Sequence, residues 1–152
     1  RAPRPDLRLE AVRQLNLAGV SAGINCAPVL PGITDSPKDL EAVVEAAARA
    51  GATSIFANPL FLKPCSASVF LPFLEKEFPH LVAQYKQRYE ERAFLPAAYG
   101  KRLSELIARL RAKHGMRNDY RRSARRAYPV PAEPGEQFNL FGDPAPPAPG
   151  KL

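Results

Sequence analysis

The sequence predicts an α/β fold in which parallel strands are joined by helices, followed by a helical section and a tail. Residues 1–64 alternate helix, strand, helix, strand with short connections, a pattern typical of a parallel sheet with crossover helices. Both strand segments are nearly continuously apolar, as expected when a strand is covered on both faces. Residues 65–115 have helical periodicity instead, and residues 116–152 are first basic and then rich in proline.

The first unit has clear start and stop signals. Arg4-Pro5-Asp6 predicts a helix start, because proline suits the first helical position and an acid suits the first turn. Gly19 is the predicted end of that helix. The apolar segment Val20–Val29 is then predicted to be a strand.

The second unit repeats the same signals. Ser36 precedes proline and is followed three residues later by Asp39, which predicts a capped helix start. An apolar stripe follows at helical spacing, and Gly51 closes the helix. Thr53–Asn58 is the second predicted strand, and a proline ends it.

One asparagine lies near the carboxyl end of each strand. Asn25 and Asn58 are placed where open α/β sheets and α/β barrels bind their ligands. Alternation along a strand puts Asn25 on the same face as Ala27, and Asn58 on the same face as Phe56. The asparagines either face a ligand or satisfy backbone groups of the loops, and spacing alone leaves both interpretations open.

Composition limits the class of protein. The chain has 152 residues and a net charge of +7, which is compatible with an anionic partner. Its two cysteines, Cys26 and Cys65, are too few for a disulfide framework and indicate a reducing, cytoplasmic setting. No apolar run reaches the ~20 residues that cross a membrane. Because the first residue is Arg1, we expect a trimmed or incomplete chain.

The stretch Ala27–Asp35 matches a loop of known form, Ala-Pro-x-x-Pro-Gly-x-x-Asp. Together with an Arg-x-Pro start and a helix Arg-Leu-Glu-Ala-Val-Arg-x-Leu, it resembles the second half of radical S-adenosylmethionine (radical SAM) proteins. The resemblance is to the branch similar to spore photoproduct lyase, also described as DNA repair photolyase. It implies that residues 1–64 form the last two strands of a partial (β/α)6 barrel, followed by a helical extension over 65–115.

The same resemblance implies that S-adenosylmethionine lies at the carboxyl ends of these strands. The fifth strand of the family backs the adenosine, and the end of the sixth strand contacts the adenine. The residues of this chain that match those positions are Asn25, Ala27, Val29, Asn58 and Leu60. Arg1 follows the family's fourth strand and is a further candidate for contact with the cofactor.

The family binds a [4Fe–4S] cluster through a Cys-x-x-x-Cys-x-x-Cys loop, which this chain lacks. Cys26 and Cys65 are too few to hold such a cluster. The resemblance therefore implies that this chain is a C-terminal fragment of an iron–sulfur enzyme and is inactive alone. It implies that the whole enzyme cleaves S-adenosylmethionine reductively and performs lyase-like radical chemistry on nucleic acid, as in DNA repair. Cys65 is a candidate for the hydrogen-donating cysteine of lyase-type members, or an incidental cysteine.

The helical section is expected to contain two helices from Ser68, broken near Phe78-Pro79, and a third over Tyr99–His114. Its aromatic residues are expected to be core residues. His80 and His114 lack metal-ligand spacing and are expected at the surface.

A basic run follows, with tyrosines beside it. Arginines interleaved with aromatic residues suit nucleic-acid backbones and unstacked bases; the alternative is a solvated tail. The run also supports a rival function, a non-enzymatic basic helical adaptor that binds nucleic acid. The candidate nucleic-acid residues are Arg117, Arg121, Arg122, Arg125 and Arg126.

The remaining residues are rich in Pro, Gly and Ala and are expected to be disordered. Within them, Gln137-Phe138-Asn139-Leu140-Phe141 resembles the peptide Gln-Leu-x-Leu-Phe by which bacterial repair and replication proteins bind the sliding clamp. The resemblance implies that Leu140 and Phe141 fill apolar pockets while Gln137 hydrogen-bonds at the entrance. Phe138 departs from the usual leucine. The alternative is an apolar cluster that folds back onto the domain.

Overall fold

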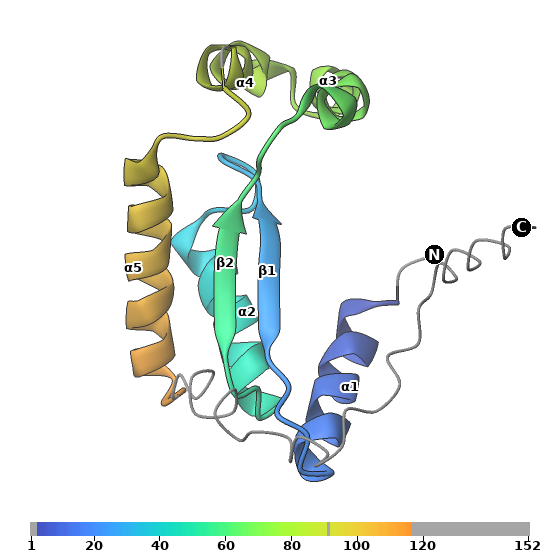
Figure 1. The fold of residues 1–152 in the computed structure, drawn as a ribbon, viewed down its shortest axis with the longest axis vertical. Helices are drawn as coiled ribbons and strands as arrows, with labels where there is room; N and C mark the ends of the chain where they lie inside the picture. Colours follow the sequence, from blue (N-terminus) through green and yellow to red (C-terminus); the bar gives the residue numbers. More distant parts are fainter. Residues whose placement is uncertain (1–2, 91, 117–152) are drawn as a thin grey trace, which may run out of the picture.

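The computed structural model describes residues 3–90 and 92–116. These residues form a mostly helical α/β structure around a small parallel sheet (Figure 1). In chain order the elements are α1 (Pro5–Leu17), β1 (Ile24–Val29), α2 (Pro37–Arg49), β2 (Ile55–Pro59), α3 (Pro64–Glu77), a 3-10 turn η1 (Pro79–Leu81), α4 (Val82–Tyr89) and α5 (Ala97–Lys113).

The predicted order of helix, strand, helix, strand is confirmed, and the two strands pair in parallel. Ile24 lies opposite Ile55 and Cys26 opposite Ala57, after which the register shifts so that Val29 lies opposite Pro59. The first strand begins later than predicted. Val20 donates its backbone N–H to Leu15 over 2.9 Å, so the start of the predicted strand instead closes the end of α1.

The predicted starts and stops of the first two helices are confirmed. The Ser36 hydroxyl accepts a hydrogen bond from the Asp39 backbone N–H at 3.1 Å, which caps α2. Gly19 and Gly51 follow α1 and α2 with φ of 81° and 70°, a left-handed conformation that glycine adopts without strain. Local sequence signals therefore set these boundaries.

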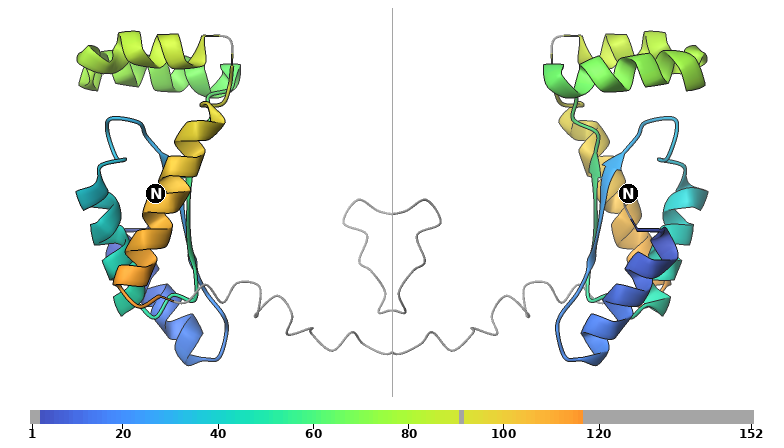
Figure 2. Two further views of the ribbon diagram at one scale, coloured as in Figure 1. Left: turned by 90° about the vertical axis from the view of Figure 1, so that its left-hand side faces the viewer. Right: turned by 90° about the vertical axis from the view of Figure 1, so that its right-hand side faces the viewer.

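Among the residues that the structure describes, helices cover one face of the sheet and leave the other open. Figure 2 shows α2 and α5 on the same side of the two strands. Ile24, Cys26 and Ala57 are half-buried against that core, which confirms that the aliphatic strand faces point to the helices. The buried members of this first core are Val29, Leu40, Val44, Ala47, Ala52, Ile55, Leu103, Ile107 and Leu110.

A second layer crosses the carboxyl ends of the strands. Helices α3 and α4 lie beyond the tips of β1 and β2 (Figure 1), and their core is formed by Leu60, Leu62, Leu74 and Tyr85. Helix α3 begins at Pro64, earlier than predicted, because this proline suits the first helical position. The expectation that the aromatic residues are core residues holds for Tyr85, which is fully buried, but not for every phenylalanine.

The Pro-Gly loop between β1 and α2 is held by tyrosines from distant helices. The Tyr85 hydroxyl of α4 donates to the Pro31 carbonyl over 2.8 Å, and the Tyr99 hydroxyl of α5 donates to an Asp35 carboxylate oxygen over 2.7 Å. The other Asp35 oxygen accepts from the Gly32 N–H over 2.7 Å. The loop is therefore fixed at both ends beside the strand tips.

The end of α5 is held against α2 by charged groups. Glu41 contacts Lys113 and accepts from His114 Nε2 at 3.1 Å, and these hydrogen bonds, that of Lys113 first, lower the pKa of Glu41. His114 is thus half-buried and paired rather than a free surface residue, while His80 is exposed as predicted. Over residues 3–90 and 92–116, every helix is too short or too polar to cross a membrane.

Candidate functional site

Asn25 and Asn58 meet on the open face of the sheet. Asn58 is next to last in β2, as predicted, but Asn25 is the second residue of β1 and not near its carboxyl end, because the strand begins only at Ile24. Asn58 Nδ2 donates to Asn25 Oδ1 over 3.2 Å, and both side chains are exposed. Within the described part of the chain, the side-chain hydrogen bond that these amides form is the one to each other. The pair offers amide donors and acceptors to a ligand that lies on this face.

A cleft of about 670 Å³ adjoins the pair. This volume is within the range of small-molecule sites, roughly 300–1,000 Å³. Three of the residues predicted to contact S-adenosylmethionine, Ala27, Asn58 and Leu60, lie in its wall. The full lining is Ala27, Pro28, Asn58, Pro59, Leu60, Phe61, Ser66 and Phe94.

Val29, also predicted to contact the cofactor, does not line the cleft. Its side chain is only 3% exposed and lies in the first core. The cause is the register shift after Cys26, which turns Val29 to the helix-covered face although alternation from Ala27 predicts the open one. Its carbonyl accepts from the Leu60 N–H over 2.9 Å, so Val29 positions the strand end.

The two thiols lie in different environments. Cys26 is half-buried on the helix-facing side of β1, and burial raises its pKa. Cys65 is exposed in the first turn of α3, with its Sγ 3.9 Å from the Ser66 hydroxyl oxygen. Cys65 adjoins the cleft in sequence through Ser66 but is not part of its lining.

No metal centre is formed by this part of the chain. Among residues 3–90 and 92–116, no three His, Cys, Asp or Glu side chains are grouped so that they could hold a metal ion. A [4Fe–4S] cluster needs three or four thiolates, and the whole sequence has two cysteines. The two cysteines of this chain therefore do not fit the cluster.

Two phenylalanines at the cleft were not predicted as site residues. Phe61 follows β2 and Phe94 precedes α5, and their rings stack with centroids 5.4 Å apart and an interplanar angle of 12°. The Lys63 ammonium lies 5.7 Å from the centre of the Phe61 ring. The position of Phe61, just after the strand-ending Pro59, was a sequence signal for this site. Nothing in the local sequence links Phe61 to Phe94.

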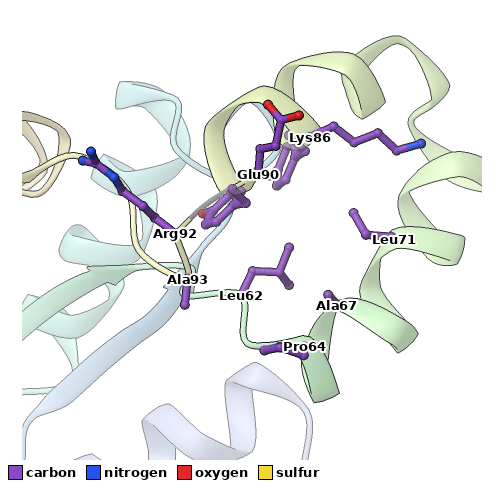
Figure 3. A pocket seen from close by; sticks show the side chains of 10 residues that line it. Leu62, Pro64, Ala67, Leu71, Lys86, Glu90, Arg92 and Ala93 are labelled. Atoms are coloured by element: carbon purple, nitrogen blue, oxygen red, sulfur yellow. The ribbon is translucent and has the colours of Figure 1, made fainter.

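A second cleft of about 570 Å³ lies between α3 and α4 (Figure 3). Its wall is mainly apolar, with Lys86, Glu90 and Arg92 as charged members. Tyr89 also belongs to this wall and donates its hydroxyl to the Leu60 carbonyl over 2.8 Å. Burial raises the pKa of Tyr89 to about 12, so this hydroxyl stays protonated and holds Leu60, a member of the first cleft, in place.

The remaining predicted site residues lie outside the part of the chain that the structure describes. In the basic run, Arg109 is exposed, Arg111 is half-buried and Lys113 pairs with Glu41. The predicted residues outside the described ranges are Arg1, Arg117, Arg121, Arg122, Arg125, Arg126, Gln137, Phe138, Leu140 and Phe141.

No family model and no solved structure matches this chain. It is similar to an uncharacterized protein of Mycobacterium bovis and to uncharacterized proteins of two Mycobacterium tuberculosis strains, CDC 1551 and H37Rv. Each is 34% identical over 119 residues, which cover 78% of this chain and 35% of the relative. The chain thus spans about a third of the length of the curated relatives it matches.

Proposed function

We propose that this chain is the C-terminal part of a cytoplasmic radical SAM enzyme, and that the cleft at the strand ends binds the adenosyl part of S-adenosylmethionine. The observation on which the proposal rests is the Asn25–Asn58 amide pair, on the open sheet face beside a cleft that contains Ala27, Asn58 and Leu60. The cleft is lined by residues at the carboxyl ends of both strands, Pro28 and Pro59 among them, and ligands of α/β sheets and barrels bind at this end of parallel strands.

The surface of the described part supports a larger domain. Helix α1 has no buried residue, and its Leu7 and Leu17 are 58% and 70% exposed. Exposed apolar surface beside an uncovered sheet face is typical of a surface that meets another element. Further barrel strands next to β1 would cover it, and the greater length of the mycobacterial relatives leaves room for them.

The chemistry of the cleft suits an adenosyl group. A ribose and an adenine present hydroxyl and ring-nitrogen groups, which the Asn25 and Asn58 amides can bond, and a flat base that the Leu60 side chain can contact. When bound at a reduced [4Fe–4S] cluster, S-adenosylmethionine supplies radical chemistry by reductive cleavage. In this proposal other residues of the parent protein hold that cluster, and this chain binds and orients the cofactor.

Nucleic acid is the proposed substrate class, on the family resemblance and on the basic run that ends in Arg126. Binding of a bacterial sliding clamp by Gln137–Phe141 remains part of the proposal for the parent. The rival function is a basic helical adaptor without enzymatic activity.

The first test is the genomic sequence upstream of Arg1. We expect a Cys-x-x-x-Cys-x-x-Cys loop about one hundred residues before Arg1, because barrels of this kind span about 200 residues or more. The encoded parent, reconstituted anaerobically with iron and sulfide and reduced with dithionite, should release 5′-deoxyadenosine. Asn58→Ala should raise its KM for S-adenosylmethionine about fivefold, the cost of one lost hydrogen bond of about 1 kcal/mol. Ser104→Ala, at an exposed position of α5, is the matched control.

Two outcomes would overturn the proposal. One is an upstream methionine with no cysteine triad between it and Arg1. The other is a reconstituted parent that binds no S-adenosylmethionine, or one whose KM is unchanged by Asn58→Ala. An upstream sequence without the triad would favour the adaptor, which needs no cofactor to bind nucleic acid.

A further inference from the structure

The stacked phenylalanines at the cleft have a form that packing alone does not explain. Phe61 and Phe94 come from segments far apart in the sequence and stack at 5.4 Å, yet they remain 48% and 62% exposed. Burial of a phenylalanine stabilises a fold by about 1.5–3 kcal/mol, and this pair forgoes much of that. Each ring covers one face of the other, so the more exposed ring, Phe94, presents the larger free surface.

The groups around the rings favour a particular ligand. The Lys63 ammonium lies 5.7 Å from the Phe61 ring centre, and within residues 3–90 and 92–116 it has no ion-pair partner. Among the described residues that line the cleft there is no carboxylate. The Asn58 amide, in the same wall, suits the edge of a base. An aromatic face beside a cation and no acid is the arrangement by which proteins bind single-stranded nucleic acid.

We propose that Phe94, supported from behind by Phe61, is a stacking platform for one unpaired base of a nucleic-acid strand, with Lys63 binding an adjacent phosphate. This inference rests on the proposed function, because it concerns the same cleft and the same substrate class, nucleic acid. It places one base of that substrate at the rim of the cleft. An apolar peptide is less well matched, because it gains little from a flat π surface beside a cation.

The platform is tested on the full 152-residue chain by fluorescence anisotropy with a labelled oligothymidine of about ten nucleotides, a length within the site size of single-strand binders. Loss of a base–aromatic stack of ~1–3 kcal/mol corresponds to about 5- to 150-fold weaker binding. We therefore expect Phe94→Leu to weaken binding at least about fivefold, and Phe94→Tyr to retain it. Lys63→Gln should reduce the log–log salt slope by about 0.7.

Controls separate the ring from the basic surface. Phe73→Leu makes the same change at another exposed phenylalanine, 46% exposed on α3, and should leave binding unchanged. An abasic strand of the same length keeps the phosphates and removes the bases, so Phe94→Leu should not affect its binding. Circular dichroism verifies that each variant is folded. If Phe94→Leu weakens both strands equally, or behaves like Phe73→Leu, the platform is refuted.

A second arm distinguishes the base of a strand from the adenine of the cofactor. Equilibrium dialysis of labelled S-adenosylmethionine should give the same affinity for the wild-type chain and for Phe94→Leu. A loss confined to the cofactor would assign the ring to adenine and overturn the inference. Absence of any oligonucleotide binding would also overturn it, whereas failure of the parent to form 5′-deoxyadenosine would overturn the proposed function and leave the platform standing.

Discussion

Removal of one hydroxyl should loosen the Pro-Gly loop at the strand ends. Tyr85 and Pro31 are both less than 2% exposed, and the Tyr85 hydroxyl donates to the Pro31 carbonyl over 2.8 Å. In Tyr85→Phe the ring still fills its place, so packing is kept. The carbonyl loses its donor at a position that water does not reach.

The magnitude follows from that burial. A typical hydrogen bond contributes about 1 kcal/mol, and a buried carbonyl left without a donor costs about 1–3 kcal/mol. We expect Tyr85→Phe to lower the free energy of unfolding by about 2 kcal/mol. For a chain of this length that corresponds to a fall in Tm of about 4–8 °C.

Tyr89→Phe is the matched control. Its hydroxyl also donates over 2.8 Å, to the Leu60 carbonyl, but it is only half-buried, so water can replace it and the loss should be about 1 kcal/mol or less. Urea unfolding followed by circular dichroism measures both variants. The reasoning is refuted if Tyr85→Phe is as stable as the wild type, or if Tyr89→Phe is the more destabilised of the two.

Two further predictions concern close packing and pH. Gly23→Ala should lower the free energy of unfolding by about 1–3 kcal/mol, because a Cβ there would lie 2.2 Å from the Ser54 hydroxyl and 2.8 Å from its carbonyl oxygen. Gly100→Ala in α5, where a Cβ would meet nothing within 4 Å, should instead raise the free energy of unfolding by about 0.5–1 kcal/mol. Equal urea midpoints for the two variants would contradict this. Burial raises the pKa of Tyr85 and Tyr99, and raises that of Tyr89 to about 12. Because these tyrosines ionise more easily when unfolded, at about pH 10, stability should be fully present below pH 10 and decline as pH rises towards 12. Tyrosinate absorbance and urea midpoints measured over that interval check it, and a midpoint independent of pH would contradict it.

The helix boundaries and the sheet could be predicted because their causes are local. Ser36 caps α2 through a backbone N–H three residues away, and Gly19 and Gly51 end their helices through their own φ angles. The parallel order of the strands follows from short connections with a helix between them. The meeting of Asn25 and Asn58 could not be predicted in the same way, because it depends on the register that places Asn25 opposite Phe56.

The cleft depends on contacts that no local pattern encodes. Phe61 stacks on Phe94 although α3 and α4 lie between them in the sequence, and no local pattern links the two residues. Val29 was misplaced because a register shift, set by how two strands pair, reverses the facing that alternation predicts. An expectation based only on the alternation of side chains along a strand cannot include such a shift.

The sequence by itself determined the first four elements, their order and the strand faces that point to the helices, because caps, glycines and alternation act within a few residues. Only the tertiary structure decided how the Pro-Gly loop is held and which aromatic rings meet at the cleft. Tyr85 binds Pro31 and Tyr99 binds Asp35 across sequence separations of 54 and 64 residues. Such pairs form where the packing of α4 and α5 against the strand ends brings them together, and that packing is a property of the whole folded chain.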